Sequence, residues 1–181
     1  MKSLTFRSIF ATAVFAAFQS VAFSQEKQAQ QFETKEIGIQ KTVIVTMTVP
    51  SSQIGSKMGE AYAKLYAYIG QKGIQPTGAP FAVYTQYDPN GNTTFEAGMP
   101  VASKIEGMGD VVYKEYPAMK VLSTLYKGAY ENVTPVYEAM EKYMKDNGMQ
   151  PTMVAWEVYL TDPAKVKKPE DNQTLIYFPL K

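Results

Sequence analysis

Cysteine and histidine are absent from the 181 residues of this chain, and tryptophan occurs once. These absences exclude a thiolate nucleophile, a serine–histidine–aspartate triad, a zinc site of the cysteine/histidine type and a histidine-ligated haem. Disulfide bonds are excluded as well. We therefore expect no cofactor and no metal, and any chemistry must come from carboxylates, lysine, tyrosine or hydroxyl groups.

An excess of positive charge is also lacking, because 18 lysines and arginines face 17 aspartates and glutamates. A protein that binds nucleic acid usually carries a basic surface, so we expect no nucleic-acid partner. The chain does have 13 tyrosines. Tyrosine offers a large surface with little side-chain entropy to lose, which favours recognition through aromatic contacts.

The first 24 residues have the pattern of a secretory signal peptide. Lys2 and Arg7 form a short positive region, residues 9–18 are largely apolar, and residues 22–24 (Ala-Phe-Ser) resemble a cleavage site. We expect cleavage after Ser24, a periplasmic or secreted protein, and no stable membrane insertion afterwards. An N-terminal membrane anchor is the alternative, although the apolar run is shorter than the roughly 20 residues that span a membrane.

Residues 25–40 are polar and rich in glutamine, which predicts a flexible leader before a folded domain of residues 41–181. Period-two alternation and helical spacing predict the elements of that domain. In chain order they are a strand at 42–49, a helix at 53–72, strands at 80–87 and 93–99, an extended segment at 111–125, a helix at 135–147, and strands at 155–160 and 174–180.

This order is β-α-β-β twice, and the sequence repeats with it. A shift of 75 positions places Tyr62 on Tyr137 and Tyr84 on Tyr159, with eight identities over positions 62 to 84. We predict an α+β fold of two tandem duplicated β-α-β-β units, about 41–100 and 111–181, related by a pseudo-twofold axis. Both helices should lie on one side of antiparallel sheets, with a ligand groove between the halves.

The two halves differ at one strand position, where Ala82 of the first corresponds to Glu157 of the second. Alternation places Trp156 on one face of the strand and Glu157 with Tyr159 on the other. If the helices cover the Trp156 face, Glu157, Tyr159 and Tyr84 lie on the opposite face. A glutamate in an apolar strand is unusual unless it is paired or used, and an edge strand with Glu157 in water is the alternative.

The second half also carries motifs of a known family. They are Gly128-x-Tyr130, the strand Trp156-Glu157-x-Tyr159 followed by Asp162-Pro163, and the terminal Tyr177-x-Pro179-Leu180. In this order they resemble the GyrI-like domain, the small-molecule (effector) binding domain of some transcription regulators. The resemblance covers about residues 41–181.

The resemblance implies a tandem β-α-β-β domain whose strand glutamate lies in an aromatic groove for lipophilic, often cationic, molecules. Carried over by position, Glu157 is that glutamate. The candidate ligand-binding residues around it are Tyr159, Tyr84, Tyr130, Trp156 and Tyr177. Regulators of this family also carry a helix-turn-helix domain, whereas the residues outside the resemblance here are the predicted signal and leader. We therefore expect the small-molecule binding domain without the DNA-binding domain.

Together these features predict an exported domain that binds amphipathic, cationic or aromatic small molecules, of the multidrug-binding kind. Some GyrI-like proteins are hydrolases that open strained cyclopropane-type rings, so an enzyme with Glu157 as general base is the alternative. A structural or protein-interaction module is the second alternative. One carboxylate without a second acid, metal or histidine is a small catalytic set, and the same residues explain binding without turnover.

Overall fold

The computed structural model describes residues 30–152 and 154–181, so the predicted signal peptide lies outside the described residues. The strands are β1 (Glu33–Ile37), β2 (Gln40–Pro50), β3 (Phe81–Gln86), β4 (Asn92–Pro100), β5 (Val112–Tyr116), β6 (Met119–Lys127), β7 (Ala155–Tyr159) and β8 (Gln173–Pro179). The helices are α1 (Ile54–Lys72) and α2 (Thr134–Asp146), and single 3-10 turns lie at η1 (Ser51–Gln53), η2 (Tyr130–Asn132) and η3 (Pro169–Asp171).

Local sequence signals account for where several of these elements end. Gly73 follows α1 with φ 63°, the left-handed conformation that glycine adopts without steric cost. Between β3 and β4, the carbonyl of Asp88 accepts from the Gly91 amide at 3.2 Å, and the Asp88 carboxylate accepts from the Asn90 amide at 3.0 Å. The predicted hairpin turn is therefore confirmed.

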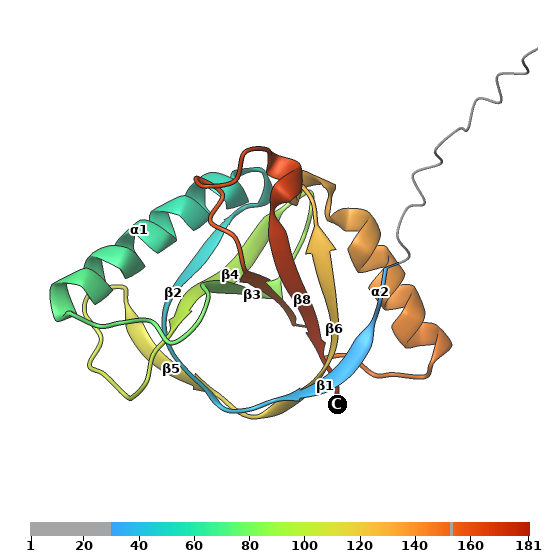
Figure 1. Cartoon of the computed structure of the whole chain (residues 1–181), viewed down its shortest axis with the longest axis horizontal. Helices are drawn as coiled ribbons and strands as arrows, with labels where there is room; N and C mark the ends of the chain where they lie inside the picture. The colour runs from blue at the N-terminus through green and yellow to red at the C-terminus, as the bar shows by residue number, and fades with distance from the viewer. Residues whose placement is uncertain (1–29, 153) are drawn as a thin grey trace, which may run out of the picture.

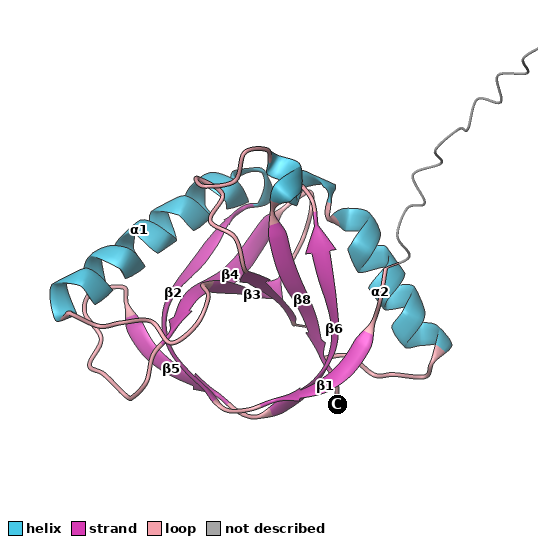
Figure 2. Ribbon diagram, in the orientation of Figure 1, coloured by secondary structure: helices cyan, strands magenta, loops and turns pink. Residues whose placement is uncertain are grey.

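All the strands belong to one antiparallel sheet, in the order β1-β6-β8-β7-β3-β4-β2-β5. The two edge strands are continuations of inner strands, because β1 leads into β2, and β5 into β6, through two residues each. Ile37 pairs with Met119, and three residues further along the ladder Gln40 pairs with Tyr116, so the register is unchanged. The sheet therefore curls until its edges meet, as Figure 2 shows at the bottom of the view.

Both helices lie on the outer face of this curled sheet, α1 against β2 and β4 and α2 against β6 (Figure 1). Under α1, a buried cluster includes Leu65, Val43 and Phe95, and under α2 a second cluster includes Met140 and Ile176. The inner face holds a third cluster. Its buried members are Ile44, Phe81, Val83, Tyr116 and Trp156. Apolar burial on both faces is the main source of stability.

The two halves occupy matching places in the sheet. The order from one edge is β1-β6-β8-β7 and from the other is β5-β2-β4-β3. Where the halves meet, Ala82 pairs with Glu157, the same two positions that the 75-residue shift aligns. The α+β class, the antiparallel sheet and the helices on one side are confirmed. An origin of the two halves by duplication stays a prediction.

The predicted flexible leader is wrong for its second part. Residues 33–37 form β1 and pair with β6, and Phe32 packs against Tyr143 of α2 with ring centroids 5.0 Å apart. Composition suggested a leader because these residues are mostly polar. The strand is nevertheless held, because β6 offers a backbone ladder and only one face of β1 needs apolar side chains.

No helix in the described part of the chain is long and apolar enough to cross a membrane.

Candidate functional site

Glu157 lies in the middle of β7 and is 8% exposed. Alternation puts Tyr159 on the same face of β7, and the β3–β7 register puts Tyr84 on that face of β3. Tyr84 and Tyr159 pack against the core under α1, so this is the outer face that the helices cover. The helices therefore cover the Glu157 face rather than the Trp156 face. The reason is that Ala82 and its neighbours on this face supply the apolar surface on which α1 packs.

Three tyrosine hydroxyls donate hydrogen bonds to the Glu157 carboxylate. Tyr137 of α2 donates to Oε1 at 2.7 Å, and Tyr159 donates to Oε2 at 2.8 Å. Tyr84 donates to Oε2 at a longer 3.3 Å, and its hydroxyl lies 3.3 Å from that of Tyr159. Hydrogen bonds to an ionised acceptor are the stronger kind, so these donors stabilise a carboxylate that has little contact with water.

Two further tyrosines complete the surroundings. Tyr62 of α1 meets the Tyr159 ring edge-on with centroids 6.3 Å apart, and its hydroxyl donates to the Phe81 carbonyl at 2.7 Å. Tyr130 of η2 meets the same ring edge-on at 5.6 Å. The tyrosine cluster is Tyr62, Tyr84, Tyr130, Tyr137 and Tyr159, all of them half-buried. Glu157 is thus enclosed by aromatic rings from both helices, two strands and η2.

The hydroxyls of this cluster remain protonated. Burial first, and then the negative charge of Glu157, raises the pKa of Tyr84, Tyr137 and Tyr159 well above the usual value for tyrosine. The pKa of Tyr130 is raised for the same two reasons. Neutral phenols can only donate to the carboxylate, so the cluster solvates the charge of Glu157 without cancelling it.

A second buried glutamate shows what Glu157 lacks. Glu96 of β4 is 9% exposed, and it accepts from the Lys114 ammonium at 2.6 Å and from the Tyr116 hydroxyl. Among the described residues, none of the salt bridges involves Glu157. A buried charge is costly unless an opposite charge compensates it. Glu157 therefore differs from Glu96 in having hydrogen-bond donors but no cationic partner within the described residues.

The structure brings four of the six predicted ligand-binding residues together: Glu157, Tyr159, Tyr84 and Tyr130. It places the other two elsewhere. Trp156 belongs to the inner-face cluster, where it stacks on Phe81 with centroids 5.0 Å apart and planes 14° apart. Tyr177 pairs with Trp156 across β7–β8 and packs against the same cluster. Strand alternation separates both side chains from Glu157 by the thickness of the sheet.

Sequence reasoning did not name Tyr62 and Tyr137 as site residues, although both lie in the two predicted helices. A signal for them was present, because these two positions align at the 75-residue shift, as Tyr84 and Tyr159 do. The shift therefore relates two pairs of tyrosines that converge on Glu157. What the sequence alone did not fix was the face of β7 on which the helices pack.

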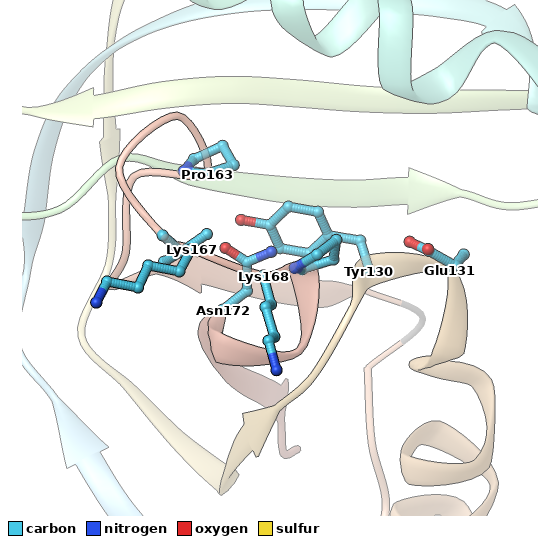
Figure 3. Close-up of a pocket in the computed structure, with 8 residues that line it drawn as sticks. Tyr130, Glu131, Pro163, Lys167, Lys168 and Asn172 are labelled. Atoms are coloured by element: carbon cyan, nitrogen blue, oxygen red, sulfur yellow. The ribbon is translucent and has the colours of Figure 1, made fainter.

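Two cavities of the described chain are not lined by Glu157. One of about 270 Å³ is lined by Tyr130 and by residues of the segment between β7 and β8, and Figure 3 shows its lining. Another of about 230 Å³ lies between α1 and residues 108–111. The groove that was predicted between the halves stays a prediction, and the tyrosine cluster lies where the halves meet. Within the described residues, no group of acidic side chains is placed to hold a metal ion.

Comparison with known proteins adds three findings. The sequence profile of the GyrI-like small molecule binding domain matches residues 18–181. No curated protein matches the sequence. Among solved structures, the C-terminal domain of EcmrR is similar with a TM-score of 0.70 and 23% identity, covering 84% of this chain and 98% of that one. In an EcmrR–DNA complex the match spans only 57% of the EcmrR chain, at 22% identity and a TM-score of 0.70.

Two more distant structures share the fold. SAV2435 bound to tetraphenylphosphonium is similar with a TM-score of 0.58 and 12% identity, covering 83% of this chain and 94% of that one. A hydrolase from Listeria innocua is similar with a TM-score of 0.60 and 13% identity, covering 83% and 92%. At these identities the likeness shows the fold alone.

Proposed function

Because this chain belongs to the GyrI-like family of small-molecule binding domains, we propose that it binds amphipathic cationic or aromatic molecules at Glu157 and the tyrosine cluster. The observation that carries the proposal is the contrast between two buried glutamates. Glu96 has Lys114 as its cation, whereas Glu157 has three phenol donors and no salt bridge among the described residues. A cationic ligand supplies the missing charge.

Magnitudes support this kind of ligand over a purely apolar one. A cation over a tyrosine ring gains roughly 0.5–2 kcal/mol, depending on how well water is excluded. The Glu157 carboxylate adds a charge interaction that strengthens as the site loses water. Several such contacts together reach the roughly 8 kcal/mol that micromolar affinity requires. A related fold, SAV2435, was solved with tetraphenylphosphonium, an aromatic cation, which makes that molecule a suitable first probe.

The direct test is a titration of the protein with tetraphenylphosphonium, read by isothermal titration calorimetry. Glu157→Gln keeps the size of the side chain but removes its charge. We expect it to weaken binding at least about tenfold, because the cation then loses its charged partner. Glu96→Gln is the matched control, since it removes a buried charge on the other face and should leave affinity unchanged. Equal affinities of wild type and Glu157→Gln would reject the electrostatic basis of the proposal.

A second candidate is hydrolysis of strained-ring compounds, favoured by the short contacts of Glu157 with Tyr137 and Tyr159. Glu157 would take a proton from water, the water oxygen would bond to a ring carbon, and a tyrosine would protonate the carbon released by the cleaved bond. Hydrolysis would need Glu157 to act without a second carboxylate, a histidine or a group of metal ligands beside it in the described chain, whereas the same contacts explain binding without turnover, which is why binding ranks first. Incubation with a cyclopropane-bearing electrophile tests this candidate. Ring-opened product that disappears in Glu157→Gln supports it, and product formation at the buffer rate excludes it.

We also propose that the protein acts outside the cytoplasm. The support is the N-terminal pattern of Lys2, Arg7 and an apolar run before Ser24. Mass spectrometry of the protein recovered from a bacterial periplasm should give a chain that starts at Gln25. A chain that still starts at Met1 would contradict export by cleavage.

A further inference from the structure

The cavity beside Tyr130 is not explained by the binding of a simple cation. It lies between η2 and the segment that joins β7 to β8, and its volume is about 270 Å³. Its lining residues are Tyr130, Glu131, Pro163, Val166, Lys167, Lys168, Pro169 and Asn172. The lining is thus partly apolar and carries two positive charges and one negative charge.

This cavity shares a wall with the tyrosine cluster. The wall is Tyr130, whose ring lies 5.6 Å from that of Tyr159, and Tyr159 in turn donates to Glu157. The negative charge of Glu157 is close enough to contribute to the raised pKa of Tyr130. A single extended molecule bound at the tyrosine cluster would therefore reach the cavity along Tyr130.

The two lysines of the cavity are free of ion pairs within the described chain. Neither Lys167 nor Lys168 takes part in a salt bridge, whereas Lys165 of the same segment pairs with Asp162 at 3.1 Å. Figure 3 shows the side chains of Lys167 and Lys168 directed away from Tyr130, and both lysines are exposed. Glu131 is the acidic residue of the lining, and it is exposed.

We propose that the cavity beside Tyr130 is a second subsite, which takes an anionic group, and that the ligand is therefore a zwitterionic amphiphile. Its cationic end lies at the tyrosine cluster around Glu157, its middle passes Tyr130, and its carboxylate or sulfonate lies near Lys167 and Lys168. This inference rests on the proposed cation site and adds the chemistry of the other end.

Three probes test the inference: benzyl(dimethyl)alkylammonium, the same cation with a carboxylate at the end of the alkyl chain, and the methyl ester of that carboxylate. Probes with alkyl chains of increasing length determine which separation of cation and carboxylate binds most tightly. In the wild type at low salt, the carboxylate should bind about three- to tenfold tighter than its ester, since exposed ion pairs are individually weak. The gain should disappear in Lys167→Ala/Lys168→Ala. It should persist in Lys165→Ala, which removes a neighbouring lysine that does not line the cavity.

The outcomes separate this inference from the proposed function. Glu157→Gln should weaken all three probes, and if it does so while carboxylate and ester bind equally at every chain length, the cation site stands and the second subsite is rejected. A gain that survives the loss of both lysines also rejects it. If Glu157→Gln weakens none of the probes, the proposed function itself is wrong. Far-ultraviolet circular dichroism confirms that each variant is folded before it is titrated.

Discussion

Single tyrosines contribute unequally to the environment of Glu157. Tyr137 and Tyr159 donate at 2.7 and 2.8 Å, whereas Tyr84 donates at 3.3 Å and also contacts the Tyr159 hydroxyl. Hydrogen-bond strength falls with distance, and a bond to a charged acceptor contributes roughly 1.5–3 kcal/mol at best. Tyr137 is also the one donor to Oε1, so no other residue of the described chain replaces it.

Tyr137→Phe should therefore destabilise the protein more than Tyr84→Phe does. We expect a loss of about 1–3 kcal/mol in the free energy of unfolding for Tyr137→Phe, because one oxygen of a buried carboxylate loses its donor. Tyr84→Phe should lose less than half of that. Urea unfolding measures both, with Tyr113→Phe as a control, since the Tyr113 hydroxyl donates to Glu115 in an exposed pair. Equal losses for Tyr137→Phe and Tyr84→Phe would contradict the expectation that the shorter hydrogen bond to Glu157 contributes more to stability.

At the scale of elements, β3 and β4 are brought together by a ring that lies over a glycine. A Cβ added to Gly98 of β4 would lie 2.2 Å from the ring tip of Phe81. The Phe81 ring cannot move away easily, because it stacks on Trp156 at 5.0 Å and meets Tyr116 edge-on at 6.0 Å. The inner face of the curled sheet is thus packed so closely at Gly98 that no side chain fits there.

Gly98→Ala should destabilise the protein by about 1–3 kcal/mol, the usual cost of inserting a methyl group into a packed core. The matched control is Gly59→Ala on the exposed side of α1, where an added Cβ meets nothing within 4 Å. That substitution should stabilise the protein by up to about 1 kcal/mol, because alanine is the better helix former. Thermal unfolding of the two variants should therefore shift in opposite directions, and a shift of both in the same direction would contradict this account.

The elements also show what sequence could and could not predict. Alternation and turn residues were enough to predict β2, β3, β4 and the hairpin between β3 and β4. The motif around Glu157 was enough to predict the family. The strand β1 was missed because its ladder partner, β6, lies more than 80 residues away along the chain. The roles of Tyr62 and Tyr137 were missed for a similar reason. Their ring positions depend on which face of the sheet the helices cover, and that is settled by packing between distant segments.

At the scale of the whole molecule, the buried tyrosines link stability to alkaline pH. Burial raises the pKa of Tyr62, Tyr84, Tyr137 and Tyr159, so the folded chain keeps protons that the unfolded chain loses near pH 10. Below that pH both states are protonated and these residues add no pH dependence. Above it the folded state binds more protons, so stability must fall as pH rises.

The contribution of these four tyrosines to the free energy of unfolding should stay constant up to about pH 9 and should then fall as the pH rises. The slope can reach about 1.4 kcal/mol per pH unit for each of the four residues. Urea unfolding at a series of pH values measures the slope, and Tyr62→Phe/Tyr84→Phe should flatten it. Tyrosinate absorbance of the folded protein gives an independent check. If all 13 tyrosines ionised together near pH 10 without unfolding, the cluster would not be buried as described.

The matching halves have a consequence for how a ligand sits. Ala82 and Glu157 pair where the halves meet, and Tyr62 with Tyr137, and Tyr84 with Tyr159, are related by the same 75-residue shift. The same shift also exchanges Glu157 for Ala82, so in the proposed site the two halves offer alike rings but only one of them offers a charge.

Tyr130 is a second difference, because the position that the shift relates to it is Gly55, which has no ring. If the proposed site binds a molecule with unlike ends, both the charge and the extra ring come from the second half of the chain. That half alone would then set the orientation of the ligand.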